Sequence, residues 1–240
     1  MKCLILAAGY ATRLYPLTEN FPKPLLDVGG KTILDWLLDD LDATGAIDGY
    51  IVVTNHKFAD IFRKWSSCSA SIQVLDDGTT TNEGRLGAVK DIQFAIEQLG
   101  IDDDVLVMAG DNLLTFSLQP FIEFFRQKGT SCVMRYYEPE LTRLRKTGVL
   151  QIDGEDRIVA MEEKPSEPKS HWCCPPFYIY RREDLRRVQE GIDAGCGTDA
   201  PGSYIAWLCT QTPVHAWPMP GERIDIGSLA SYEEANRKYK

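Results

Sequence analysis

Two short segments near the N-terminus carry side chains that can hold a chain of phosphates. The first, Leu6-Ala-Ala-Gly-Tyr-Ala-Thr-Arg13, overlaps an apolar run, residues 3–8, that is typical of a buried strand. Its small residues let backbone N–H groups approach phosphate oxygens closely. The planar guanidinium of Arg13 can clamp outer phosphates, and Lys23, in the second segment, offers a compact charge for a reacting phosphate. We therefore predict a site where cations stabilise negative charge on phosphate.

A polar turn, Gly110-Asp111-Asn112, follows the apolar run Val105–Met108. In an open parallel sheet, ligands bind at the carboxyl ends of the strands, because the loops that follow the strands gather there. The loop over residues 9–23 and the 110–112 turn both stand at such ends. We therefore expect the two segments to lie side by side.

Strands and helices alternate in the first half of the chain. Buried strands are expected at 3–8, 50–54, 72–75 and 105–108, and amphipathic helices at 32–41, 58–65 and 86–98. This alternation predicts a three-layer α/β/α sandwich with a mixed, mostly parallel central sheet. The second half should add antiparallel strands at 131–137, 147–151, 157–163 and 176–180. No linker or repeat interrupts the chain, so we predict one domain over residues 1–240.

Composition excludes several classes of partner. The chain has 240 residues, 26 basic against 35 acidic side chains and a net charge of -9, with no basic run, so nucleic acid is not expected as a partner. No apolar stretch approaches a membrane span, and the N-terminal apolar run is too short for a signal peptide. An odd, irregularly spaced set of thiols does not predict a disulfide framework. We expect a reduced, cytoplasmic protein. Its cysteines are Cys3, Cys68, Cys132, Cys173, Cys174, Cys196 and Cys209.

Other chemical motifs have little support. Cys173 and Cys174 with His171 could suggest a metal site, but adjacent cysteines rarely bind one zinc together, so buried thiols are the expected outcome. His56 and His215 have no nucleophile motif as partner, so a hydrolase triad is not predicted. The 6–14 segment matches neither the P-loop nor the dinucleotide fingerprint, which excludes ATPase and dehydrogenase interpretations.

The order of these motifs resembles that of the sugar-phosphate nucleotidyltransferases. Their signature is L-A-A-G-x-G-T-R-L, then P-L-T and P-K-P-L, and the later landmarks Gly110-Asp-Asn, Glu163-Lys-Pro and Asp225-Ile-Gly recur here in order. The family includes glucose-1-phosphate thymidylyltransferases, mannose-1-phosphate guanylyltransferases and N-acetylmuramate-1-phosphate uridylyltransferase-like enzymes. The resemblance implies a Rossmann-like nucleotidyltransferase fold in its short form, without a C-terminal β-helix domain. It also implies Mg²⁺-dependent transfer of a nucleoside monophosphate from an NTP to a sugar 1-phosphate.

The resemblance implies roles for individual residues. Arg13 and Lys23 would be the catalytic cations, and Asp111 and Asp225 would hold Mg²⁺ between the α-phosphate and the attacking phosphate. Asp111, Glu163 and Lys164 would bind the acceptor. Residues 1–115 would form the nucleotide-binding half, and residues 116–240 the acceptor-binding half. The residues expected to contact the nucleotide are Leu6, Ala7, Ala8, Gly9, Tyr10, Ala11, Thr12, Asn82 and Gly87.

Two positions depart from the family pattern. Ala11 stands where the family usually has the second glycine of its loop. Because alanine disfavours a positive φ, we expect the loop to follow a slightly different path there. Arg223 stands where a tryptophan is frequent, which puts the packing against the acceptor in doubt.

Two alternatives keep the fold but change the function. A cytidylyltransferase acting on phosphocholine would read a quaternary ammonium with an aromatic cage, for which Trp172, Tyr178 and Trp217 are the candidates. Glu163 favours a sugar instead, because a carboxylate can accept hydrogen bonds from hydroxyl groups. A non-catalytic regulator that binds nucleotide sugars would not need both metal-binding aspartates. The base, the sugar and the oligomeric state stay open.

Overall fold

The computed structural model of the chain describes residues 1–67 and 69–239, so Cys68 and Lys240 lie outside the described residues. The chain forms two compact units that are interleaved in sequence. Unit 1 comprises Met1, Leu86–Met108 and Pro120–Met219, and unit 2 comprises Lys2–Arg85, Ala109–Gln119 and Pro220–Lys240. The single domain predicted over residues 1–240 stays a prediction, and each unit is described by itself.

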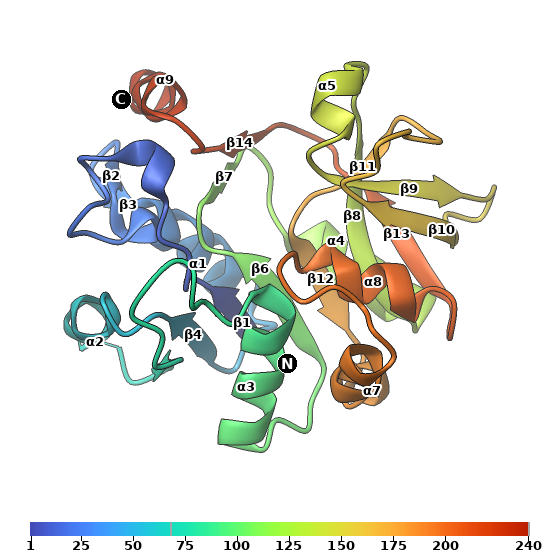
Figure 1. Ribbon diagram of the computed structural model, residues 1–240, viewed down its shortest axis with the longest axis horizontal. Coiled ribbons are helices and arrows are strands. Elements are labelled where there is room, and N and C mark those ends of the chain that lie inside the picture. Colours follow the sequence, from blue (N-terminus) through green and yellow to red (C-terminus); the bar gives the residue numbers. More distant parts are fainter. Residues whose placement is uncertain (68, 240) are drawn as a thin grey trace. The chain divides into compact units, whose positions relative to one another are not determined.

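Unit 2 is built on three parallel strands. β1 (Lys2–Leu6) pairs with β4 (Tyr50–Thr54), and β4 pairs with β5 (Ile72–Asp76), as the alternating pattern predicted. Every residue of β4 is buried, which explains its unbroken apolar sequence YIVVT. Figure 1 shows these strands in blue and cyan with α2 (Ala59–Ser66) beside them, and α2 packs against β5.

Local sequence signals fix both ends of α1 (Ile33–Thr44). Thr32 caps its first turn by accepting a hydrogen bond from the Asp35 amide, while the Asp35 carboxylate accepts one from the Thr32 amide. Gly45 ends the helix in a left-handed conformation with φ 62°. The helix packs against β7 and against the turn that contains Lys23, so its ends help to place the chemical residues.

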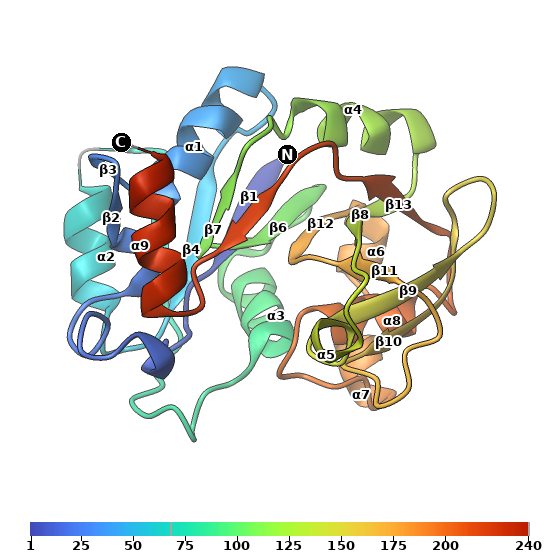
Figure 2. The same cartoon turned by 90° about the horizontal axis from the view of Figure 1, so that it is seen from above.

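Two small ribbons complete unit 2. β7 (Asn112–Leu114) pairs antiparallel with β14 (Arg223–Asp225), and β2 (Asp27–Val28) pairs with β3 (Lys31–Thr32). Figure 2 shows β7 and β14 running side by side, followed by α9 (Leu229–Lys238). Short strands of this kind have no periodic sequence signal, and the sequence did not predict them.

One hydrophobic cluster ties these pieces of unit 2 together. Its members come from the N-terminal loop, the ribbons, α1 and α9, and half-buried aromatic rings cover it. Leu113 and Ile226, which follow Asp111 and Asp225 closely in sequence, are both fully buried there. The buried members are Leu14, Leu26, Val28, Ile33, Leu113, Ile226 and Ala235.

Unit 1 has a largely antiparallel sheet. Its strands lie in the order β10-β9-β11-β8-β12-β6, and β13 pairs parallel with β8. The predicted α/β fold with a mixed sheet is thus confirmed. The strands are β6 (Val105–Ala109), β8 (Ser131–Tyr137), β9 (Gly148–Ile152), β10 (Ile158–Glu163), β11 (Trp172–Cys174), β12 (Phe177–Tyr180) and β13 (Val214–Pro218).

The helices of unit 1 are mostly short. The predicted helix at 86–98 is α3 (Ala88–Leu99), whereas the later ones were not predicted. Of the helices in the described ranges, none combines the length and the apolar character that a membrane span requires. The other helices are α4 (Gln119–Lys128), α5 (Leu141–Leu144), α6 (Arg182–Leu185), α7 (Val188–Asp193) and α8 (Gly202–Leu208).

The cluster in unit 2 makes a prediction about stability. Ile226→Ala removes buried apolar volume from a cluster made of short, otherwise weakly held segments. We expect the free energy of unfolding to fall by about 2–4 kcal/mol, measured by urea denaturation. Leu229→Ala, at a leucine that is 42% exposed, is the control and should change it by less than about 1 kcal/mol. Equal effects of the two changes would contradict the role of the cluster.

Candidate active site

Unit 2 contains a cavity of about 240 Å³ next to the N-terminal loop. The loop after β1, the Lys23 turn, the 109–111 turn and the β14–α9 connection all contribute to its wall. The sequence-predicted site residues that line it are Leu6, Ala7, Gly9, Ala11, Arg13, Lys23, Asp111 and Asp225. The expectation that the 9–23 loop and the 110–112 turn lie together is therefore confirmed.

The Lys23 ammonium group lies between the two aspartates. Its Nζ is 2.7 Å from Asp111 Oδ2 and 3.6 Å from Asp225 Oδ1. The lysine side chain is only 10% exposed, so solvent screens these contacts less than it screens a surface ion pair. Two carboxylates from distant parts of the sequence thus converge on one cation.

Backbone pairing explains how Asp225 reaches this position. In the β7–β14 ribbon, Asp225 lies directly opposite Asn112, the residue after Asp111. Ser228, rather than Asp225, caps α9 by accepting a hydrogen bond from the Ser231 amide. The aspartate is therefore not needed as a helix cap.

The turn before Asp111 requires a glycine. A Cβ added to Gly110 would lie 3.0 Å from Ile5 Cγ2 and 3.3 Å from the Pro24 ring. The Gly110 amide also donates to the Leu6 carbonyl oxygen at 3.3 Å. The missing side chain lets the 110–112 turn approach the loop closely enough for Asp111 to contact Lys23.

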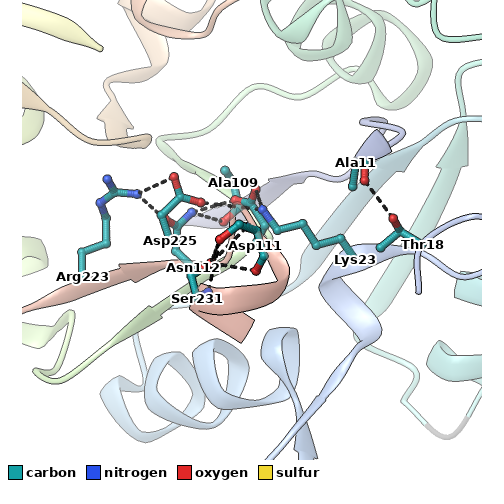
Figure 3. Close-up of polar contacts among 10 residues, drawn as sticks. Ala11, Thr18, Lys23, Ala109, Asp111, Asn112, Arg223, Asp225 and Ser231 are labelled. Atoms are coloured by element: carbon teal, nitrogen blue, oxygen red, sulfur yellow. Dashed lines mark hydrogen bonds and ion pairs between the residues drawn. The ribbon is translucent and has the colours of Figure 1, made fainter. Parts of the chain in front are cut away.

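Ala11 adopts the left-handed conformation that favours glycine, with φ 46° and ψ 41°. Its carbonyl oxygen accepts hydrogen bonds from the Leu14 amide at 2.9 Å and from Thr18 Oγ1 at 2.8 Å. Figure 3 shows the Thr18 contact beside the cluster around Lys23. Alanine thus adopts the conformation that it intrinsically disfavours, because these bonds hold residue 11 there, and the expected difference from the loop path of the family stays a prediction.

Two side chains anchor the loop from outside the cavity. Tyr10 is buried, and its hydroxyl donates to the Thr79 carbonyl oxygen at 3.2 Å. Asn55 is fully buried, and its Nδ2 donates to the Ala8 carbonyl oxygen at 3.0 Å. Ala8 and Tyr10, predicted to touch the nucleotide, are thus held by the protein itself. With the exposed Thr12, they are not part of the cavity wall.

Asn82, the predicted reader of the base, lies in the same unit but not at the cavity. It is half-buried in the loop after β5, and its carbonyl oxygen accepts a hydrogen bond from Arg85 Nη1 at 2.8 Å. It is absent from the described residues that form the cavity wall. Its contact with a base stays a prediction.

Gly87 belongs to unit 1, where it precedes α3. Its φ is 92°, and an added Cβ would lie 2.6 Å from the Thr198 carbonyl oxygen. The next two amides, of Ala88 and Val89, donate to the carbonyl oxygens of Asp199 and Thr198. A glycine is needed here for close packing of two backbone segments, which is a structural reason beside the predicted contact with nucleotide.

Glu163 and Lys164 are the predicted acceptor ligands, and in unit 1 Glu163 ends β10 and Lys164 follows it. The Glu163 carboxylate occupies a slot next to two glycines: a Cβ on Gly202 would lie 2.2 Å from Glu163 Oε2, and one on Gly148 would lie 3.0 Å from it. Burial raises the pKa of this carboxyl above its ordinary value of 4.5, although the charge of Lys164 opposes the rise. Lys164 is exposed and has a left-handed backbone with φ 49°.

The thiols and His171 do not form a second site. Among the described residues, no group of three or more His, Cys, Asp or Glu side chains is placed to hold a metal. Cys173 and Cys174 are buried free thiols, as predicted, and His171 Nδ1 is bonded to the Glu138 carbonyl oxygen at 2.8 Å. Burial raises the pKa of the Cys132 thiol to about 12, so that thiol is not poised to react.

Asp111 and Asp225 suit a divalent cation that is shared with a substrate. Mg²⁺ prefers hard oxygen ligands and usually takes one or two carboxylates together with phosphate oxygens and water. The two aspartates already contact one cation, the Lys23 ammonium group, which shows that their oxygens converge. The donor set therefore fits the predicted metal.

Sequence reasoning missed two residues beside this cluster. Asn112 was read only as part of a landmark, and Arg223 only as a departure from the family pattern. In the structure Arg223 Nη1 donates to Asn112 Oδ1 at 2.6 Å and lies 3.8 Å from Asp225 Oδ2 (Figure 3). The only sign in the sequence that these two residues belong to the site was that they lie close in sequence to the two aspartates.

Comparison with known proteins agrees with this geometry. A family model described as nucleotidyl transferase matches residues 2–240. Glucose-1-phosphate adenylyltransferase of Fervidobacterium nodosum is 27% identical over 97% of this chain and 60% of its own length. The bifunctional protein GlmU of Methanocaldococcus jannaschii is 26% identical over 99% of this chain and 54% of its own length. The chain thus spans little more than half the length of these curated relatives.

Solved structures show the same fold. UDP-glucose pyrophosphorylase in complex with UDP-glucose gives a TM-score of 0.83 at 19% identity, over 99% of this chain and 97% of that chain. The apo form of UDP-glucose pyrophosphorylase gives 0.82 over the same shares. At this identity the likeness establishes the fold alone.

The backbone of Ala11 gives a prediction about strain. A non-glycine residue in the left-handed region destabilises the folded state by about 1–2 kcal/mol. A glycine at this position avoids that strain, but part of the benefit is lost because glycine gives the unfolded chain more conformational freedom. We expect Ala11→Gly to raise the free energy of unfolding by about 0.5–1 kcal/mol, measured by urea denaturation. Ala206→Gly, within α8, is the control and should lower it by a similar amount. A loss of stability in Ala11→Gly would show that residue 11 is not strained.

Burial of Glu163 gives a prediction about pH. Because the pKa of Glu163 is raised on folding, the folded chain binds the carboxyl proton more tightly than the unfolded chain does. Protonation of Glu163 therefore stabilises the folded chain, and this stabilisation is lost as the pH rises through the folded-state pKa. Glu163→Gln keeps the shape but has no charge to bury, so it should be more stable than the parent at neutral pH. The difference should shrink below pH 4.5, where the parent is also neutral. Urea denaturation from pH 4 to 8 checks this, and a difference that does not vary with pH would contradict it.

Proposed function

The chain belongs to the nucleotidyl transferase family, as its motifs predicted, and we propose that it transfers a nucleoside monophosphate unit from an NTP to a sugar 1-phosphate. The products are a nucleotide-activated sugar and pyrophosphate. The observation that carries the proposal is the convergence of Lys23, Asp111 and Asp225 at a cavity lined by a loop of small residues and Arg13. Phosphate chemistry at such a site needs positioned charge rather than a protein nucleophile.

In this proposal the protein aligns two phosphates and stabilises their charge. An oxygen of the acceptor phosphate attacks the α-phosphorus of the NTP, and the bond to the bridging oxygen of the β-phosphate breaks in line with it. Backbone N–H groups of the 9–12 loop and the Arg13 guanidinium hold the triphosphate. Lys23 neutralises charge that develops on the α-phosphate, where a compact ammonium group on a flexible stem can follow the moving oxygens.

We take the divalent cation to be Mg²⁺, held by Asp111 and Asp225 together with phosphate oxygens and water. A metal held there would supply positive charge that stabilises negative charge on phosphate oxygens. Lys23 would then exchange its contacts with the carboxylates for contacts with phosphate oxygens. Its position between the aspartates supports this exchange, because it shows that their oxygens converge on a cation.

The acceptor side of the proposal rests on Glu163 and Lys164. A half-buried carboxylate can accept hydrogen bonds from sugar hydroxyls, and an exposed lysine can meet a phosphate. The three candidates for an aromatic cage are each engaged elsewhere. Trp172 stacks on the Arg135 guanidinium, Tyr178 on another tyrosine, and Trp217 on a phenylalanine. These contacts favour a sugar over phosphocholine as the acceptor.

Pyrophosphate release tests the proposed reaction directly. The protein is assayed with Mg²⁺ and each common NTP, crossed with hexose 1-phosphates, amino-sugar 1-phosphates and phosphocholine. We expect release only when one NTP, one sugar 1-phosphate and the metal are all present. Release with phosphocholine alone among the acceptors would change the acceptor class. If the protein binds a nucleotide but no pair of substrates releases pyrophosphate, the result would favour a non-catalytic regulator that binds nucleotide sugars.

A Lys23 variant links the reaction to the site. Lys23→Ala should lower kcat by about 10²- to 10³-fold, because it removes charge stabilisation made mainly in the transition state. Lys64→Ala, at an exposed lysine of α2, is the matched control and should retain full activity. An unimpaired Lys23 variant would exclude this lysine from catalysis.

A further inference from the structure

Arg223 is a second cation near the two aspartates, on the side away from Lys23. Arg223 Nη1 donates to Asn112 Oδ1 at 2.6 Å and is 3.8 Å from Asp225 Oδ2. Its side chain is 16% exposed, so the charge is only partly screened by water. The pairing of β14 with β7 fixes this position, since Arg223 lies two residues before Asp225 on the same short strand.

Asn112 links Arg223 to the other aspartate, Asp111. Its Oδ1 accepts from Arg223, and its Nδ2 donates to Asp111 Oδ1 at 2.8 Å. Asn112 is 1% exposed, which leaves its amide little freedom to turn. The bond from Arg223 and the bond that Nδ2 donates to the Ala109 carbonyl oxygen at 3.4 Å together fix which end of the amide faces Asp111.

The four oxygens of the two carboxylates are divided among Lys23, Arg223 and the Asn112 side-chain amide. Asp111 Oδ2 and Asp225 Oδ1 face Lys23. Asp111 Oδ1 faces the Asn112 amide, and Asp225 Oδ2 faces the Arg223 guanidinium (Figure 3). The formal charges of the two aspartates are thus matched by those of Lys23 and Arg223.

The two cations differ in how easily they can leave. Lys23 is a point charge on a flexible stem, and an incoming triphosphate offers it other oxygens. Arg223 presents a planar group that is held by its bond to a buried amide. When a divalent cation enters, Lys23 can withdraw, but Arg223 stays close to the metal site.

We propose that Arg223 makes metal binding depend on the nucleotide. Its fixed charge repels a divalent cation that arrives alone, whereas a cation that arrives with the triphosphate brings its own negative charge. Arg223 also orients Asn112 and Asp225, so it is a positioning residue with an electrostatic effect on the metal. This inference rests on the proposed function, because it takes Asp111 and Asp225 as the metal-binding carboxylates.

Charge and orientation predict opposite effects when Arg223 is neutralised. If the arginine only oriented the carboxylates, its loss would weaken metal binding. If its charge dominates, its loss should tighten the binding of a metal without nucleotide. The guanidinium is partly buried and close to a carboxylate oxygen, where a unit charge acts strongly on a doubly charged ion, so we expect the charge to dominate.

Binding of Mn²⁺ to the full chain without nucleotide tests this, measured by the EPR signal of free Mn²⁺. Arg223→Gln removes the charge and retains an amide that can donate to Asn112. We expect it to bind Mn²⁺ on the order of ten-fold more tightly than the parent. Adding a non-hydrolysable NTP should then improve Mn²⁺ binding less in this variant than in the parent.

Matched variants distinguish the effect of the charge at residue 223 from the effect of the net charge of the protein. Arg223→Lys keeps the charge and should bind Mn²⁺ as the parent does. Arg126→Gln, at an exposed arginine of α4, changes the net charge equally and should have no effect. The double change Arg223→Gln with Asp225→Asn should lose the added affinity.

Several results would overturn the inference. They are Mn²⁺ binding in Arg223→Gln that is equal to or weaker than in the parent, the same gain in Arg126→Gln, or a gain that survives Asp225→Asn. Pyrophosphate release by the parent is measured separately. Release that requires the metal, with no gain in Arg223→Gln, would reject the role of Arg223 and leave the proposed function standing. A thermal melt of each variant confirms that it is folded.

Discussion

The register of one short ribbon determines whether this site exists. Asp111 and Asp225 lie far apart in sequence, and the pairing of β7 with β14 brings them together by placing Asp225 opposite Asn112. Side chains alternate between the two faces of a strand, so a slip of one residue would turn Asp225 away from Lys23. A ribbon of three residues per strand cannot secure its register by its own hydrogen bonds. Something outside the ribbon must hold it.

The hydrophobic cluster of unit 2 supplies that hold. Each charged residue of the site has a buried member of the cluster within three positions: Leu14 after Arg13, Leu26 after Lys23, Leu113 after Asp111 and Ile226 after Asp225. Burial of these neighbours fixes the backbone, while the polar side chains turn the other way, into the cavity. The C-terminal helix adds Ala235 and the rings of Tyr232 and Tyr239 to the same cluster. The packing of this helix therefore supports the site, although none of the helix residues lines the cavity.

The sequence predicted those parts of the site that belong to long, strongly patterned elements. The alternation of buried strands and helices placed Lys23 and Asp111 at the same edge of a sheet, and the structure brings them into contact. It could not predict β14 or the contact of Arg223 with Asn112, because a three-residue strand has no periodicity and its partner is set by tertiary packing. The Glu163 slot next to Gly148 and Gly202 was hidden because tertiary packing brings these three residues together. At Ala11, two hydrogen bonds to its carbonyl oxygen outweighed the intrinsic preference of alanine.

Two carboxylates held this close repel each other, and the repulsion must be offset before any substrate arrives. Lysine and arginine offset it in different ways. Lys23 forms contacts that it can exchange, because its ammonium group has no fixed plane and its stem is flexible. Arg223 forms contacts that persist, because its planar group is bonded to a buried amide that in turn holds Asp111. A site with one movable and one fixed cation retains one of the two positive charges beside the carboxylates when the lysine withdraws, which favours a metal ion that arrives with a polyphosphate.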